Sequence, residues 1–236
     1  MSEQKGQMAL DISIRDSVSF ASFVAGHNRE LVHQLREIAQ GNKLQATLLI
    51  WGESGGGKSH LLNACFRLAE KHDRKAWFVA LADLAEEAGS EAILDGLEDY
   101  DLYLVDGLDS VAGKAGWEER LFQLCNYSRD HNKSLIISAV RPPTSLDIKL
   151  RDLLTRLMSG LTYQVLPLSD GQKITALQER AHDRGFDLSD DAVKYMLNRY
   201  RRETGSLFRM LEEIDRASLE QKRLITIPFL RSMSFD

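Results

Sequence analysis

A glycine-rich octapeptide constrains the fold of this 236-residue chain more than any other feature. It consists of Gly52, Glu53, Ser54, Gly55, Gly56, Gly57, Lys58 and Ser59 and fits G-x-x-x-x-G-K-[ST] at every fixed position. Glycines let consecutive backbone N–H groups turn inward and cradle an anion, and a helix that begins here adds its positive end. Because an apolar run precedes the segment and a helical pattern follows it, we predict a phosphate-binding loop and not an inert turn.

The residues around this loop predict a nucleotide site with Mg²⁺. Lys58 is expected to reach the β- and γ-phosphates, and the Ser59 hydroxyl is expected to bind the metal. Asp106 ends an apolar run, as a metal-shell carboxylate should. His60 follows the loop directly and is expected to pack beside the nucleotide. The residue after Asp106 is Gly107, which cannot polarise an attacking water. Asp109 is a nearby acid but does not stand at that position, so intrinsic hydrolysis is expected to be weak or absent.

The hydrophobic pattern predicts an α/β domain followed by a small helical one. Short apolar runs predict strands at 46–51, 76–82, 102–105, 135–140 and 162–166, and helical spacing predicts helices at 27–39, after the loop to about residue 71, and at 117–131. This alternation indicates a five-stranded parallel sheet sandwiched by helices. After Pro167 only helical patterns follow, and Ser169 and Gln172 have capping-box spacing. We therefore predict a tail at 1–17, a nucleotide-binding domain at 18–167 and a three-helix lid at 168–236.

Composition excludes several other classes of protein. The net charge of -5 argues against a dedicated DNA-binding surface. The two cysteines, Cys65 and Cys125, lie in helical apolar patterns and are expected to be buried free thiols. No apolar run approaches the ~20 residues that a membrane span needs, and the N-terminus has no signal-type segment. A cytoplasmic protein is expected.

Several strings resemble DnaA-related AAA+ proteins. Residues 20–28 resemble the segment that opens the AAA+ domain of the bacterial replication initiator DnaA, and residues 57–64 resemble its phosphate-loop helix. Strings at 111–113 with 117–119, 141–143, 167–170, 176–178, 184–186 and 224–229 resemble the Hda family, which is paralogous to DnaA. The resemblance covers nearly the whole chain. It implies the AAA+ fold, with ADP or ATP and Mg²⁺ as cofactors.

The resemblance also implies a function and two partners. Members of the Hda family inhibit DNA replication initiation by regulatory inactivation of DnaA. In the ADP-bound form, tethered to the DNA-loaded sliding clamp (the β subunit of DNA polymerase III), they stimulate hydrolysis of DnaA-bound ATP. Arg156 matches the family's arginine finger, which acts in trans on the partner's nucleotide. The clamp-binding peptide maps to Gln7, Met8, Leu10 and Ile12, with Asp11 where proline is usual; it would bind as an extended segment.

Some positions depart from the family pattern. Val140 stands where an acidic sensor residue is frequent, and Gly205 stands where the lid's sensor arginine is expected; Arg202 and Arg209 are the candidate substitutes. Ser159 replaces a tryptophan. With Gly107, these changes favour a chain that holds nucleotide without cycling it.

Two other functions stay open from the sequence. One is an autonomous ATPase that loads another replication protein, as helicase loaders do, and the other is a nucleotide-gated scaffold. The chain ends about where the lid of the initiator ends, before that protein's helix-turn-helix domain, so no sequence-specific DNA reading is expected. The sequence also leaves a homodimer open.

Overall fold

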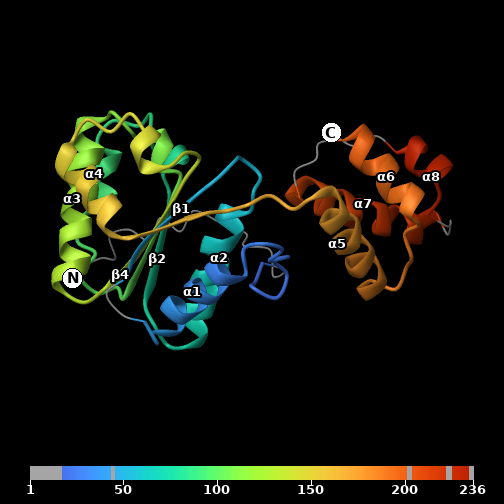
Figure 1. Ribbon diagram of the computed structural model, residues 1–236, viewed down its shortest axis with the longest axis horizontal. Coiled ribbons are helices and arrows are strands. Elements are labelled where there is room, and N and C mark those ends of the chain that lie inside the picture. Colours follow the sequence, from blue (N-terminus) through green and yellow to red (C-terminus); the bar gives the residue numbers. More distant parts are fainter. Residues whose placement is uncertain (1–17, 44–45, 201–203, 222–224, 234–236) are drawn as a thin grey trace, which may run out of the picture.

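The computed structural model describes residues 18–43, 46–200, 204–221 and 225–233. These residues form an α/β body and a smaller helical body, joined by the extended segment after the last strand (Figure 1). The strands are β1 (Thr47–Trp51), β2 (Ala76–Ala80), β3 (Leu102–Asp106), β4 (Ser134–Ala139) and β5 (Leu161–Gln164). They form one parallel sheet in the order β2-β3-β4-β1-β5. The predicted five-stranded parallel sheet is therefore confirmed.

Helices bury both faces of this sheet. Helices α1 (Arg29–Gln40) and α2 (Lys58–Lys71) cover one face, where Leu48 and Ile50 of β1 point. Helices α3 (Ala115–Asp130) and α4 (Arg151–Ser159) cover the other face, where Leu49 points. Because successive strand residues alternate between faces, β1 must be apolar on both sides. This explains the continuous apolar run that predicted it.

Three strands end earlier than the apolar pattern predicts. Asn28 exchanges two side-chain hydrogen bonds with the backbone of Leu166, 2.9 and 2.8 Å long, so this part of the chain leaves the sheet after Gln164. The N–H of Val140 donates to the Asp109 carboxylate, and β4 ends one residue before it. Strand β2 ends at a short 3₁₀ helix, Leu81–Asp83. At the ends of β4 and β5, hydrogen bonds with the side chains of Asp109 and Asn28 thus replace those between strands.

The described residues of the lid form the three predicted helices and a short fourth one. They are α5 (Asp170–Asp183), α6 (Asp190–Arg199), α7 (Thr204–Gln221) and α8 (Ile227–Ser232). The capping box at Ser169 is formed with Gln172, as predicted. Helix α8 is too short for periodicity to reveal, but Thr226 caps it and Phe229 is buried in the lid core. This cluster is separate from the two that flank the sheet.

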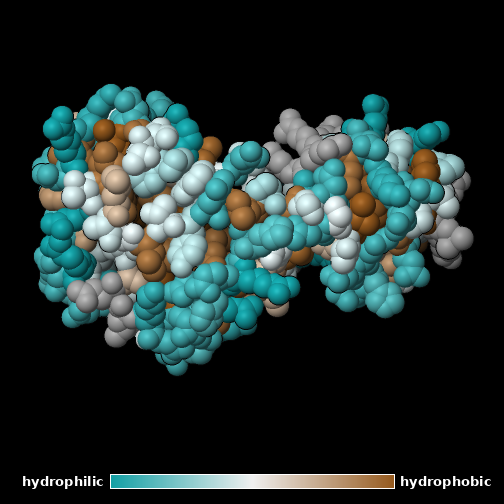
Figure 2. All heavy atoms as spheres, in the orientation of Figure 1, coloured by the Kyte–Doolittle hydropathy of each residue, from teal (hydrophilic) through white to brown (hydrophobic). Residues whose placement is uncertain are grey.

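Both cysteines are buried free thiols, which confirms the prediction from their apolar settings. Burial raises the pKa of Cys125 to about 12, so this thiol stays protonated. In the described ranges, every helix is too short or too polar to reach across a lipid bilayer. In the view of Figure 2, hydrophilic residues cover most of the visible surface, and hydrophobic residues are visible in smaller areas on both bodies.

Candidate nucleotide-binding site

A pocket of about 930 Å³ lies between the two bodies, at the carboxyl end of the sheet. This volume is in the range of small-molecule sites. The site lies where such sites are expected, because the crossovers that leave the adjacent strands β1 and β4 run in opposite directions across the sheet. The α/β body, the N-terminal segment, the hinge at 166–168 and the start of α7 all contribute to the walls. The predicted nucleotide-binding residues that line it are Glu53, Ser54, Gly55, Gly56, Gly57, Lys58, Ser59, His60 and Asp106.

Two glycines of the loop occupy places where a side chain would not fit. A Cβ on Gly52 would lie 2.6 Å from the carbonyl oxygen of Val165. Gly57 precedes α2 with φ +94°, and a Cβ there would lie 2.8 Å from the Phe23 ring. The chain therefore passes closely between β5 and the N-terminal segment, and α2 begins with its free N–H groups at the pocket.

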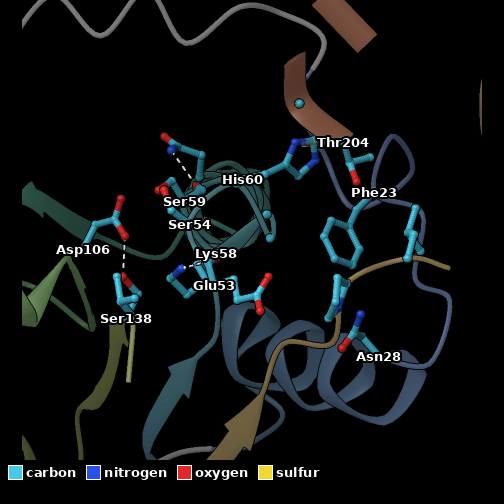
Figure 3. Close-up of a pocket in the computed structure, with 18 of the residues that line it drawn as sticks. Phe23, Asn28, Glu53, Ser54, Lys58, Ser59, His60, Asp106, Ser138 and Thr204 are labelled. Carbon is cyan, nitrogen blue, oxygen red and sulfur yellow. Dashed lines mark hydrogen bonds between the residues drawn. The ribbon is translucent and has the colours of Figure 1, made fainter. Parts of the chain in front are cut away.

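Lys58 is drawn into the base of the loop. It is 8% exposed, and its ammonium donates to the carbonyl oxygens of Gly52 at 2.7 Å and Glu53 at 2.9 Å. Burial lowers the pKa of Lys58, and the negative charges of Asp106 and Asp109 oppose that change. Figure 3 shows Lys58 beneath the loop, with Asp106 to one side. The loop thus places a cation at the centre of its own anion cradle.

Asp106 is oriented by a serine from the neighbouring strand. The Ser138 hydroxyl donates to Oδ1 of Asp106 and accepts the Gly107 N–H at 2.9 Å (Figure 3). The described residues form no hydrogen bond with Oδ2 of Asp106, and Ser59 is exposed in the same pocket. Hydroxyl and carboxylate oxygens are the donors that Mg²⁺ prefers, so these two residues fit the predicted metal role. Gly107 itself has φ +85° and no side chain that could act as an acid.

His60 joins the loop helix to the N-terminal segment. Its Nε2 lies 2.9 Å from the carbonyl oxygen of Ser19 and 3.4 Å from the Ser22 hydroxyl, and its ring lies 5.7 Å from that of Phe23. Burial lowers the pKa of His60, so the ring is neutral at physiological pH and donates to the Ser19 carbonyl. This arrangement agrees with the expected packing role.

Several pocket residues were not anticipated from the sequence. They are Phe23, Asn28, Ser138, Lys173 and Thr204. The Lys173 side chain is only 11% exposed, and its nearest carboxylate, Asp170, is 3.9 Å away. Asn28 stands before α1 and could have been recognised as a polar residue at a helix start, but it makes no cap and binds Leu166 instead. The sequence held no comparable signal for the others, since they come from segments far from the loop.

The lid supplies one of the two candidate substitutes for the missing sensor arginine. Arg209 lines the pocket, and its guanidinium donates to the Ser206 hydroxyl at 3.1 Å. Gly205 also lines the pocket and has open space where a Cβ would lie. Arg202 lies outside the described residues, as do the predicted clamp-binding residues Gln7, Met8, Leu10 and Ile12.

Arg156 lies away from this pocket, in the last turn of α4. It is half-buried, and its positive charge lies close enough to Cys125 to lower the pKa of that thiol, against the larger effect of burial. No carboxylate among the described residues forms an ion pair with it. An arginine held on a helix without a carboxylate partner can meet an anion on another molecule.

Comparison with known proteins agrees with this architecture. A family model of the bacterial DnaA ATPase domain matches residues 14–164, and a model of the Hda lid domain matches residues 170–233. Domain III of the Thermotoga maritima replication initiation protein DnaA is 18% identical, with a TM-score of 0.74 over 91% of this chain and 94% of that one. DnaA from Aquifex aeolicus, solved with AMPPCP bound, is 20% identical, with a TM-score of 0.70 over 84% of this chain and 65% of that one.

Because the solved structures are only about 20% identical to this chain, they establish its fold alone, whereas the family models establish its family membership. The DnaA model covers well over half of the chain, and the lid model continues from the hinge almost to the end. This chain therefore belongs to the bacterial DnaA ATPase-domain family of AAA+ proteins, and its lid places it in the Hda branch of that family.

Proposed function

We propose that this protein is a nucleotide-bound negative regulator of replication initiation, which stimulates hydrolysis of the ATP held by DnaA. One contrast carries the proposal. The chain's own pocket has a glycine, Gly107, where a water-activating acid would stand, while Arg156 is presented on another part of the surface without an ion-pair partner in the described structure. These two features suit a chain that stimulates hydrolysis of ATP bound to a partner more than hydrolysis of nucleotide in its own pocket.

The pocket is the proposed site for an adenine nucleotide. The turned loop and the start of α2 offer backbone N–H groups to the phosphates, and Lys58 adds a positive charge from below. Lys173 and Arg209 bring further positive charge from the lid side. The AMPPCP bound to the Aquifex protein occupies a relative with the same fold, which supports nucleotide binding here.

Mg²⁺ would be held by Ser59 and Asp106, where it would neutralise charge between the phosphates. The Ser138 hydroxyl keeps the Asp106 carboxylate turned toward the pocket. Without an acid after Asp106, the bound nucleotide would not be turned over efficiently. ADP, which is the state proposed for the active regulator, would therefore be bound directly and not formed from ATP in this pocket.

Arg156 would act on the nucleotide of DnaA. A guanidinium is always charged and offers a planar fork of donors suited to phosphate oxygens. Fingers of this type accelerate hydrolysis by about 10³–10⁵-fold. Helix α4, packed on the sheet through the buried Leu153 and Leu157, would present this group rigidly.

Tethering to the sliding clamp completes the proposal. Gln7, Met8, Leu10 and Ile12 have the composition of a short peptide that docks in an apolar groove. A tether raises the effective concentration of the regulator where DNA has just been replicated. The Gln7→Ala variant is expected to lose clamp binding while its nucleotide affinity is unchanged.

The decisive experiment measures hydrolysis of DnaA-bound ATP with clamp-loaded DNA and the Arg156→Ala variant. We expect stimulation to fall by about 10³-fold while nucleotide and clamp binding persist. Arg151→Ala, which removes an exposed arginine from the same helix, is the matched control. Normal stimulation by the Arg156 variant would mean that the finger is elsewhere or that hydrolysis is stimulated by another route.

An autonomous ATPase of the helicase-loader type is the second candidate. Its support is a fold likeness to DnaI, at 14% identity with a TM-score of 0.54 over 64% of this chain and 89% of that one. This function needs a water-activating acid in the chain's own pocket, and Asp109 is the carboxylate nearest to that role. A high rate of ATP hydrolysis by the protein alone, lost in Asp109→Asn, would favour the second candidate over the first.

A further inference from the structure

A buried carboxylate on α3 has no role in the nucleotide pocket. Glu118 is 2% exposed, and no Lys or Arg side chain in the described parts of the chain forms an ion pair with it. Its charge is satisfied by backbone donors instead. Oε1 accepts the Gly113 N–H at 2.7 Å, Oε2 accepts the Leu150 N–H at 2.7 Å, and the Lys149 N–H lies 3.1 Å from both oxygens. Burying a carboxylate without such partners would be very unfavourable.

Two of these donors lie at the beginning of α4. Leu150 is the N-cap residue of this helix and has no side chain that can accept a hydrogen bond. Glu118 therefore accepts the N-cap N–H from another helix, as the N3 Glu or Gln does in a capping box, and it places a negative charge near the positive end of α4. The start of α4 is held by a side chain that lies 32 residues earlier in the sequence than Leu150.

The third donor ties this arrangement to the nucleotide side of the molecule. Gly113 follows the 3₁₀ helix Leu108–Ser110, which begins two residues after Asp106. One carboxylate thus joins the segment that leaves the pocket to the segment that enters α4. The start of α4 is fixed relative to the pocket as well as to α3.

From these contacts we infer that Glu118 is a positioning residue for Arg156, which rests on the function proposed above for that arginine. Arg156 lies six residues after Leu150, about 9 Å along the helix axis. Helix α4 is short, so the position of its first residues determines how the helix is rotated about its axis and how far it is shifted along it. These two quantities determine where the Arg156 guanidinium lies. Leu153 and Leu157 hold the helix on the sheet, and Glu118 defines its register there.

The Glu118→Gln variant tests this inference with little change in volume. Glutamine has one acceptor oxygen, and its NH₂ group would face a backbone N–H in either orientation, at Gly113 or at Leu150. We expect the maximal rate of stimulated DnaA hydrolysis to fall by about 100-fold, because small misplacements of a catalytic group have effects of that order. The concentration for half-maximal stimulation and the nucleotide affinity should be unchanged.

Ser128→Ala is the control for a general loss of stability. Ser128 lies on the same helix, is fully buried and donates to the Cys125 carbonyl at 3.1 Å, and its side chain forms no hydrogen bond with a described residue of α4. Its removal should leave the maximal rate unchanged. An equal fall in both variants would show that Glu118 acts only through stability, and the positioning role would be wrong.

Amide hydrogen exchange gives a readout that needs no partner. In Glu118→Gln the amides of Lys149, Leu150 and the first turn of α4 should exchange at least tenfold faster, while those of Ser128→Ala should not. Unchanged exchange overturns the inference whatever the hydrolysis assay shows. If wild type and Arg156→Ala stimulate DnaA equally, the proposed function fails, and the exchange comparison still decides whether Glu118 holds α4.

Discussion

Lys58 and Arg156 are both cations that we propose to bind phosphates, but their surroundings in the molecule are opposite. Lys58 is buried and donates to two carbonyl oxygens of its own loop. Arg156 is half-buried and forms no ion pair with a described carboxylate. A cation that binds the chain's own ligand, as proposed for Lys58, can be buried beneath the binding loop. A cation that binds a partner's ligand, as proposed for Arg156, has to remain accessible from outside.

The two sites also differ in how they are assembled. Eight consecutive residues and one helix end form the proposed phosphate-binding loop, so its geometry is nearly local. The position of Arg156 depends on contacts with α3, on the sheet and on loops far away in sequence. A site formed by neighbouring residues tolerates substitutions elsewhere in the chain. A site assembled from distant segments is sensitive to substitutions in any of those segments. The following variants test this contrast.

Among the variants that follow, the largest effect is expected from Lys58→Ala. It removes the buried charge beneath the phosphates, and truncating one partner of a buried charged interaction weakens binding by roughly 100-fold or more. Titration with a fluorescent ADP analogue measures this. Lys71→Ala, at the exposed far end of the same helix, is the control and should bind normally. Equal affinity in the two variants would remove Lys58 from the site.

Replacing Arg156 by lysine sharpens the comparison, because the charge stays and only the fork is lost. We expect stimulation of DnaA hydrolysis to fall by about 10- to 100-fold, less than in the alanine variant. ADP affinity should be unaffected. Full activity of the lysine variant would show that charge alone is required and that precise placement of α4 is unimportant.

A smaller effect is expected from Ser138→Ala, which frees the Asp106 carboxylate to rotate. Removing a group that orients a metal ligand typically lowers metal affinity by about 10- to 100-fold. We expect a decrease of about 10-fold for Ser138→Ala. Nucleotide affinity measured with Mg²⁺ should fall, and affinity measured with EDTA should not. A loss that is the same under both conditions would indicate that Ser138 supports the fold and not the metal.

The smallest effect is expected from pH acting on His60. Its folded-state pKa is lowered by burial, so the unfolded chain, with the ordinary value of 6.5, takes up a proton first as pH falls. The stability that neutral His60 contributes should therefore be complete above pH 6.5 and decline below it. Thermal midpoints of wild type and His60→Gln, compared from pH 7.5 to pH 5, should converge on the acidic side. A constant difference would contradict this.

The sequence was informative where structure follows from neighbouring residues. The loop at 52–59, the strand before it and the helix after it were all predicted, because glycine freedom and side-chain periodicity are local properties. The Ser169 capping box was predicted for the same reason. Strand ends were less accurate, since Asn28 and Asp109 compete for the backbone groups of residues that appeared to belong to strands.

The sequence by itself determined the loop, the parallel sheet and the presence of a helical lid, because each is written in contiguous patterns of apolar and glycine residues. Only the tertiary structure decided that Ser138 orients Asp106, that Lys173 and Arg209 line the pocket, and that Glu118 caps a helix it does not belong to. Such contacts join segments brought together by the crossovers of the sheet. A hydrogen bond between residues far apart in the chain leaves no periodic trace in the sequence around either partner.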